Sequence, residues 1–123
     1  MTEPTKRGRR KSAHKLSQAS KTALVAEEQI KAAFDFWIET MKKSRPVLDD
    51  KRRQCIGAAI HDYGLEEVLH AIEGCTFSDF HMGRNRANKK YDDVSLILRD
   101  AEHIERFLEL YDNRSKGSES IVK

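Results

Sequence analysis

The chain has 123 residues, with 23 lysines and arginines against 20 aspartates and glutamates, and a formal net charge of +3 at pH 7. This length leaves room for one domain with a single small core. No segment resembles a signal peptide, and no apolar run approaches the roughly 20 residues needed to cross a bilayer, so we expect a cytoplasmic protein with no membrane partner.

The charge is unevenly distributed. Residues 1–21 contain seven lysines and arginines and one acidic residue, a balance of +6, so the remainder carries −3. This segment is too polar to offset the entropy lost on ordering, which predicts a disordered basic arm. Such an arm is typical of proteins that bind a polyanion, although a solubilising tail has the same composition. Its candidate nucleic-acid contacts are Lys6, Arg7, Arg9, Arg10 and Lys11.

Helical periodicity begins after the arm. Apolar residues recur three and four positions apart, which predicts a first helix over about residues 22–43. Arg45-Pro46 is expected to end it, because proline disfavours helical geometry in the residue before it. The apolar face of this helix consists of Ile30, Phe34, Trp37, Ile38 and Met41.

Two further helices follow. Asp49 is a suitable N-cap for the second helix, and Gly64 suits its end because glycine tolerates positive φ. The third helix begins at Leu65, with Gly74 near its end. The apolar positions of the two helices are Cys55, Ile56, Ala59, Ile60 and Tyr63, then Val68, Leu69, Ile72 and Cys75.

The last elements are a short fourth helix and a fifth. The fourth carries Asp92 and Asp93 in its first turn, where carboxylates are favoured by the helix dipole. The fifth ends near Tyr111, before a polar tail over residues 113–123. We therefore expect an all-α domain over residues 22–112, a small bundle of about five helices with Trp37, Phe34, Ile60, Leu69, Ile97 and Phe107 in its core.

The segment between the third and fourth helices is the most informative part of the chain. It combines cations and side-chain amides with a flexible Gly83, a donor-rich mixture suited to phosphates or to an acidic protein surface. The candidate contacts are Arg84, Asn85, Arg86, Lys89 and Lys90. Lys51-Arg52-Arg53 either extends this surface or is a solvated helix face. No rigid bidentate pair is evident, so we expect weak sequence preference.

Aromatic and acidic residues flank these cations. Phe80, His81 and Tyr91 form either a platform for unpaired bases or, as favoured here, anchors of the loop: two rings in the core and a histidine bonded to a backbone carbonyl. Asp92 and Asp93 are expected to start a helix and to order the basic loop through ion pairs.

No residue set indicates catalysis, a metal site or a cofactor. Cys55 and Cys75 lie on predicted helices and are expected to be packed thiols. No close Cys-x-x-Cys pair, phosphate-binding glycine loop or nucleophile elbow is present. We therefore expect a protein that is not an enzyme and binds no metal.

Several motifs together resemble a known family. They are Phe34-x-x-Trp37, Tyr63-Gly64-Leu65-Glu66-Glu67-Val68, Ala71-Ile72-x-Gly74-Cys75, Ser78-x-Phe80-His81-Met82-Gly83, Tyr91-Asp92-Asp93 and Ile97-Leu98-Arg99-Asp100. The stretch from Phe34 to Phe107 resembles the C-terminal domain of bacteriophage and prophage replication proteins, loosely similar to DnaD-like domains. Asn88 stands where that pattern has glycine, a tolerable exchange because asparagine visits the left-handed region.

This resemblance implies a replication initiator or helicase-loading adaptor in a bacterial host cell. Such a protein binds DNA and a replisome protein such as the replicative helicase. The alternative is a protein-interaction or inhibitor module of a mobile element, whose cationic loop docks on a host protein without nucleic acid. Leu24, Val25 and Ala26 precede the main apolar face of the first helix and suggest a homo-oligomer.

Overall fold

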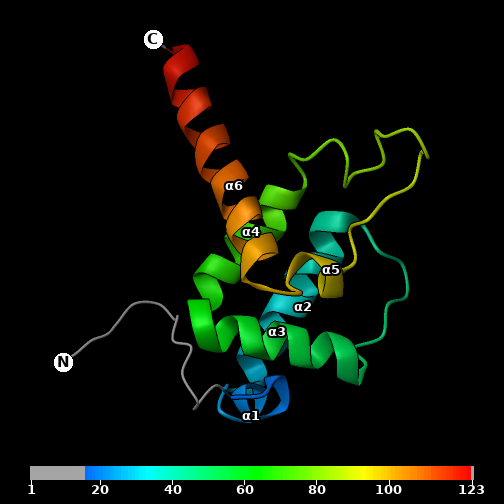
Figure 1. Ribbon diagram of the computed structural model, residues 1–123, viewed down its shortest axis with the longest axis vertical. Coiled ribbons are helices and arrows are strands. Elements are labelled where there is room, and N and C mark those ends of the chain that lie inside the picture. The colour runs from blue at the N-terminus through cyan, green and yellow to red at the C-terminus, as the bar shows by residue number, and fades with distance from the viewer. Residues whose placement is uncertain (1–15, 123) are drawn as a thin grey trace, which may run out of the picture.

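The computed structural model describes the backbone of residues 16–122 and the side chains of residues 16–114. This part of the chain contains six helices and no strand, which confirms the predicted all-α bundle (Figure 1). The helices are α1 (Gln18–Ala23), α2 (Glu27–Met41), α3 (Asp50–Tyr63), α4 (Leu65–Cys75), α5 (Val94–Ile97) and α6 (Ala101–Val122).

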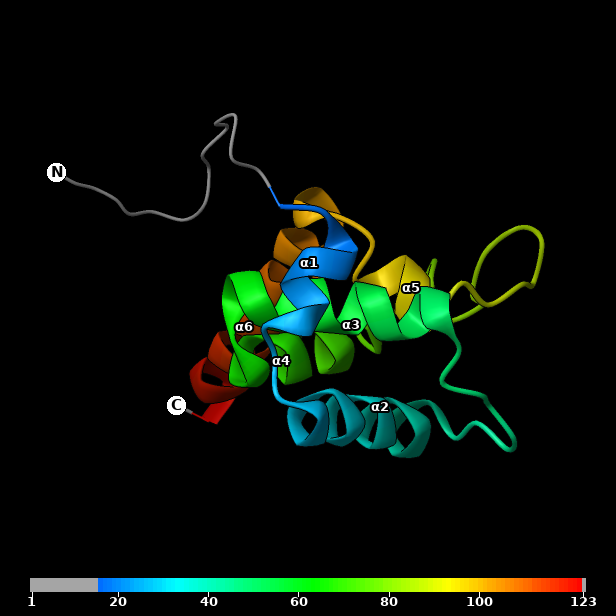
Figure 2. The ribbon, with the colours of Figure 1, turned by 90° about the horizontal axis from the view of Figure 1, so that it is seen from below.

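One hydrophobic core joins these helices. The most extensive helix contacts are those of α4 with α6 and of α1 with α3, while α2 packs along one side of the bundle (Figure 2). Of the predicted core residues, Leu69 is half-buried at the edge and the others are buried. The largest side chains with almost no exposed surface are Trp37, Phe107, Ile30, Ile56, Ile72, Ile97 and Leu98.

The predicted first helix over residues 22–43 is wrong, because the chain forms two helices there. α1 begins inside the expected arm, where the Ser17 hydroxyl accepts a hydrogen bond from the Ser20 N–H at 3.1 Å. The backbone is extended at Ala26, and α2 starts after it. α2 then ends before Pro46 is reached, because Lys42 adopts a left-handed conformation with φ 55°.

Docking on α3 orders α1. Thr22 is buried, and its hydroxyl donates to the carbonyl of Gln18 at 2.8 Å and to that of Gln54 on α3 at 3.3 Å. A Cβ built on Gly57 of α3 would lie 2.4 Å from the Thr22 hydroxyl oxygen, so α1 can approach α3 only over a glycine. Lys21 adds an ion pair with Asp62 at 2.7 Å.

α6 is longer than the sequence pattern predicts. It continues to Val122, through the segment expected to be a polar tail, and projects beyond the bundle (Figure 1). That segment contains no proline, so nothing in it forces the backbone out of helical geometry. The packed part of α6 meets α4 at Gly74, where an added Cβ would lie 2.0 Å from the Phe107 carbonyl oxygen.

Candidate nucleic-acid interface

The α4–α5 connection, residues 76–93, projects from one end of the bundle. The α2–α3 connection leaves the bundle at the same end in both views (Figures 1 and 2). The two connections therefore lie at the same end of the bundle, although residues 50–75 separate them in the sequence. We refer to residues 79–91 as the basic loop.

A short stem holds the basic loop in shape. Met82 and Lys90 form an isolated antiparallel bridge, and the Tyr91 N–H donates to the His81 carbonyl at 2.8 Å. Two residues with positive φ, Gly83 at 96° and Asn88 at 54°, turn the chain between the two sides. The expectation that Asn88 adopts the left-handed conformation is thus confirmed.

Asn85 braces the loop from inside. Its side-chain nitrogen donates to the carbonyl of Phe80 at 2.7 Å and to that of Lys89 at 2.8 Å. Its side-chain oxygen accepts from the Lys89 N–H at 3.2 Å. Both amide hydrogens are therefore used within the loop, so the structure places Asn85 as a positioning group rather than as a free phosphate donor.

The four loop cations are all exposed but differ in their surroundings. Arg84 pairs with Asp79 at 2.8 Å, an exposed contact that competes with any ligand. Within the described residues, Arg86, Lys89 and Lys90 have no ion-pair partner, and the Lys89 ammonium lies 5.8 Å from the centre of the Tyr91 ring. Three positive groups thus stand on a braced loop without a neutralising carboxylate.

Phe80 is not in the core, contrary to the prediction, and 56% of its surface is exposed. Its ring stacks on half-buried Tyr91, with centroids 5.2 Å apart and planes 8° apart. His81 meets Phe80 edge-on at 5.3 Å and buried Phe107 at 4.9 Å. A row of rings therefore runs from Phe107 in the core through His81 to the exposed Phe80. The exposure of Phe80 could not be predicted from its residue type, because phenylalanine is apolar.

The His81 imidazole also differs from the expectation. Its Nδ1 lies 2.7 Å from the Ser78 hydroxyl, not next to a backbone carbonyl. Burial, followed by the positive Arg106 and by His103, lowers the pKa of His81. Since a free histidine titrates near pH 6.5, His81 is neutral at pH 7 and adds no charge to the loop.

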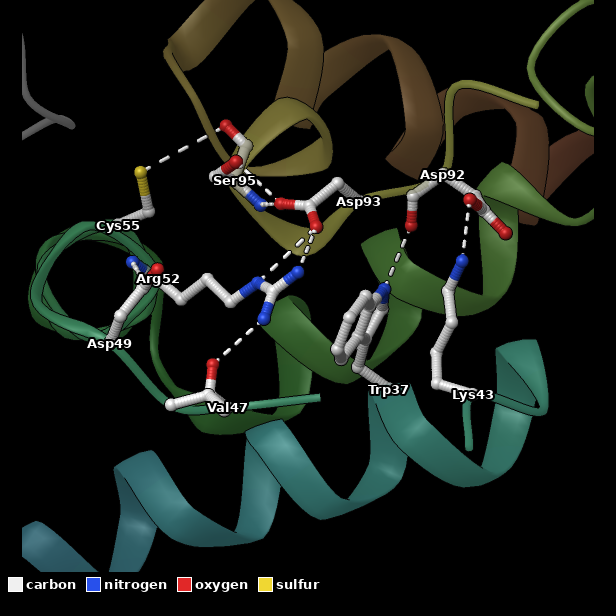
Figure 3. Close-up of polar contacts among 9 residues, drawn as sticks. All are labelled: Trp37, Lys43, Val47, Asp49, Arg52, Cys55, Asp92, Asp93 and Ser95. Atoms are coloured by element: carbon white, nitrogen blue, oxygen red, sulfur yellow. Dashed lines mark hydrogen bonds and ion pairs between the residues drawn. The ribbon is translucent and has the colours of Figure 1, made fainter. Parts of the chain in front are cut away.

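Asp92 fixes the end of the loop to α2, as Figure 3 shows. It lies before α5 rather than in its first turn, and only 4% of its surface is exposed. Its carboxylate pairs with Lys43 at 2.9 Å, and its carbonyl accepts a hydrogen bond from the Trp37 indole at 2.8 Å. The expected pairing of Asp92 with the loop cations is therefore wrong, because Lys43 already neutralises it.

Asp93 fixes the same segment to α3. It is the N-cap of α5 and accepts from the Ser95 N–H at 2.9 Å, while Arg52 binds its other oxygen at 2.6 Å (Figure 3). Burial alone would raise the pKa of Asp93, but the hydrogen bonds from Arg52 and Ser95 outweigh it and lower the pKa. Asp93 likewise leaves the loop cations unpaired.

The second connection adds cations that sequence reasoning missed. Lys42 and Arg45 are exposed and have no ion-pair partner among the described residues. The sequence signal for them is the basic run Lys42-Lys43-Ser44-Arg45, which also marks the end of the first helix. In contrast, Arg52 and Arg53, which the sequence suggested as an extension of the basic surface, already form ion pairs with Asp93 and Glu27.

The remaining candidate residues are the cations of the predicted arm and the two cysteines. Lys6, Arg7, Arg9, Arg10 and Lys11 fall outside the described residues. Cys55 and Cys75 are buried free thiols, as predicted, and burial raises the pKa of Cys75 to about 12. Within residues 16–114, no three His, Cys, Asp or Glu side chains gather closely enough to hold a metal ion. No helix of the described chain is long and apolar enough to cross a membrane.

Comparisons of the chain with protein-family models, curated proteins and solved structures find no match. The resemblance to phage replication proteins therefore stays a prediction. The projecting surface itself combines an exposed aromatic ring with cations that have no ion-pair partner among the described residues.

Proposed function

We propose that this protein binds DNA, chiefly through its phosphate backbone, with the basic loop as the main contact. The observation that carries the proposal is the exposure of Arg86, Lys89 and Lys90, which are held on a braced loop and have no ion-pair partner among residues 16–114. Phosphate contacts require positive charge and reach more than fixed geometry. Lys42 and Arg45 at the same end of the bundle supply further contacts.

The fold supports this assignment by compensating the two carboxylates that follow the loop. Asp92 and Asp93 are bound to Lys43 and Arg52. Their charges are therefore compensated inside the scaffold, and they do not cancel the loop cations. Arg84, which pairs with Asp79, contributes less than its neighbours in this proposal.

We further propose that the protein acts in DNA replication as a phage-type accessory rather than as an enzyme, and that it contacts the replicative helicase or another replisome protein. This part depends on the resemblance of residues 34–107 to phage replication proteins.

We also propose that the protein forms a homo-oligomer, because Leu24, a large apolar residue between α1 and α2, is 68% exposed. Sedimentation of the full chain at increasing concentration tests it, and a monomer throughout would contradict it.

DNA binding is tested by fluorescence anisotropy with labelled single-stranded and double-stranded oligonucleotides at about 50 and about 200 mM salt. The full chain is compared with the Arg86→Ala/Lys90→Ala variant. We expect binding that weakens about tenfold or more with salt in the wild type, because counterions are released from the phosphates. The variant should bind more weakly and show a shallower salt dependence.

A variant with the same loss of charge elsewhere is the control. Lys31→Ala/Arg53→Ala removes two cations that pair with Asp35 and Glu27, outside the basic loop. We expect this control to bind nearly as well as the wild type. Equal weakening in both variants would contradict a role for the loop. Absence of binding at low salt would contradict DNA binding and favour the protein-docking alternative.

A further inference from the structure

Phe80 is the exposed end of the row of rings described above. Tyr91 stacks on it and the His81 ring lies nearly perpendicular to it, yet 56% of the Phe80 surface stays exposed. The Phe80 carbonyl accepts a hydrogen bond from Asn85, which positions the backbone, and the Phe80 ring stacks on Tyr91 of the stem. A ring positioned in this way loses less freedom when a ligand stacks on it than a ring on an unbraced loop.

Lys89 places positive charge beside the same stack. Its ammonium lies 5.8 Å from the Tyr91 ring centre, and Lys90 forms the stem opposite Met82. A flat, apolar surface next to cations matches a nucleotide whose base is unpaired, since its base and its phosphate require these two environments. In an intact duplex the base faces are covered by their neighbours, and such a surface has nothing to stack on.

We propose that Phe80 is a stacking platform for an unpaired base, so that the basic loop binds single-stranded nucleic acid in preference to duplex. The base extends the offset stack of Tyr91 and Phe80, while Lys89 and Lys90 bind the adjoining phosphates. This inference rests on the proposed nucleic-acid binding and adds the strandedness of the ligand. It predicts little preference among bases, because every base has an aromatic face.

The test separates bases from phosphates. Two labelled oligonucleotides of equal length are titrated with the full chain: oligothymidylate, and an abasic strand with the same sugar-phosphate backbone and no bases. We expect the wild type to bind oligothymidylate about fivefold or more tightly than the abasic strand, in line with the stacking energies of aromatic residues. A duplex of the same length offers no free base face, so Phe80→Leu should leave the affinity for the duplex unchanged.

Two substitutions at Phe80 complete the design. Phe80→Leu keeps an apolar side chain but removes the ring, and we expect it to lose the preference for oligothymidylate while its affinity for the abasic strand stays unchanged. Phe80→Trp retains an aromatic face and should keep the preference. Because Phe80 is exposed, circular dichroism should show both variants folded like the wild type.

The outcomes distinguish this inference from the function on which it rests. Equal binding of the two strands by the wild type, or a preference that survives Phe80→Leu, overturns the stacking platform and leaves backbone binding intact. In that case the exposed ring is better explained as a contact for a protein partner. Binding of the duplex alone overturns the stacking platform, and failure to bind either strand or the duplex at low salt overturns both proposals.

Discussion

The indole nitrogen of Trp37 donates a hydrogen bond to the main-chain carbonyl of Asp92 across 2.8 Å, joining two residues 55 positions apart. Trp37 has no exposed surface, and the ammonium of Lys43 and the guanidinium of Arg52 lie 5.6 and 5.1 Å from its ring centre. The end of the basic loop is thus fastened to the centre of the core. Rigidity of the loop and stability of the fold are coupled at this residue.

Replacing Trp37 by phenylalanine tests that coupling. The change removes the Trp37 donor to the buried Asp92 carbonyl and weakens both cation–π contacts, so we expect a loss of about 2 kcal/mol in the free energy of unfolding. Urea unfolding followed by far-UV circular dichroism measures it. Phe34→Leu, which reduces volume in the same cluster without removing a donor, is the control for packing. A Trp37→Phe loss no larger than that of the control would contradict a role for the hydrogen bond.

The Lys43–Asp92 ion pair makes a second prediction. Asp92 is almost fully buried, and its second oxygen, Oδ2, has no hydrogen-bond partner in the described part of the chain, so Lys43 compensates its charge. Lys43→Met should therefore cost about 2 kcal/mol or more, because it leaves an unpaired buried carboxylate.

A double-mutant cycle with Asp92→Asn checks this interpretation. We expect the Lys43→Met/Asp92→Asn variant to be more stable than Lys43→Met alone, since the amide carries no charge to compensate. Thermal or urea unfolding gives the four free energies. Additive effects of the two substitutions would show that the ion pair contributes nothing.

The helix faces could be predicted from the sequence because apolar spacing reports directly on burial. The break between α1 and α2 could not, since residues 24–26 are Leu-Val-Ala and contain no proline or glycine. It results from the docking of Thr22 over Gly57, a contact between residues 35 positions apart. Long-range packing of this kind overrides local helix preference and leaves no local signal.

The candidate site is likewise only partly predictable from the sequence. The cations of the basic loop and the left-handed Asn88 follow from residue type and neighbouring sequence. The partners of Asp92 and Asp93 do not, because Lys43 and Arg52 are more than 40 positions away. Phe80 was expected to be buried because it is apolar, and its exposure depends on which side of the stem faces the bundle.

Close packing at Gly57 of α3 and at Gly74 of α4 gives a third prediction. At Gly74, an added Cβ would meet the main chain of Phe107 at 2.0 Å, and that backbone cannot move without separating α4 from α6. We expect Gly74→Ala to destabilise the fold by about 3 kcal/mol. At Gly57 the obstacle is the Thr22 side chain on the short α1, so Gly57→Ala should displace α1 at a smaller cost.

Hydrogen exchange distinguishes the two variants. Gly57→Ala should increase exchange within α1 and leave α4 and α6 protected, whereas Gly74→Ala should increase it throughout the bundle. Uniform effects of both substitutions would contradict the view that α1 is a separately docked element.

The pH dependence of stability provides a fourth prediction. Hydrogen bonds from Arg52 and Ser95 outweigh the effect of burial and lower the pKa of Asp93, so the folded protein binds this proton less readily than the unfolded chain. Its contribution to stability is therefore present above about pH 4, the unfolded value, and is lost as the pH falls through the lower folded pKa.

Comparison of the wild type with Asp93→Asn isolates this contribution from that of Asp62 and Asp100, whose pKa values are also lowered. The variant should be less stable by about 1 kcal/mol at pH 7, and the difference should shrink as the pH falls from about 5 to about 2. Urea unfolding at each pH measures it. A difference that stays constant with pH would show that ionisation of Asp93 is not involved.

Asn85 allows loop shape to be separated from loop charge. Asn85→Ala removes the hydrogen bonds to the Phe80 and Lys89 carbonyls without changing the net charge. The loop must then be ordered when the ligand binds, which we expect to weaken oligothymidylate binding by about fivefold. The dependence of the logarithm of affinity on the logarithm of salt concentration should not change, because its slope counts the phosphates neutralised and every cation is still present.

Arg86→Ala is the matched comparison: it leaves the brace intact and should reduce that slope by about 0.7 on a single strand. A slope that falls in Asn85→Ala as it does in Arg86→Ala would mean that Asn85 governs which cations reach phosphate, and an unchanged affinity would mean that the brace does not matter for binding.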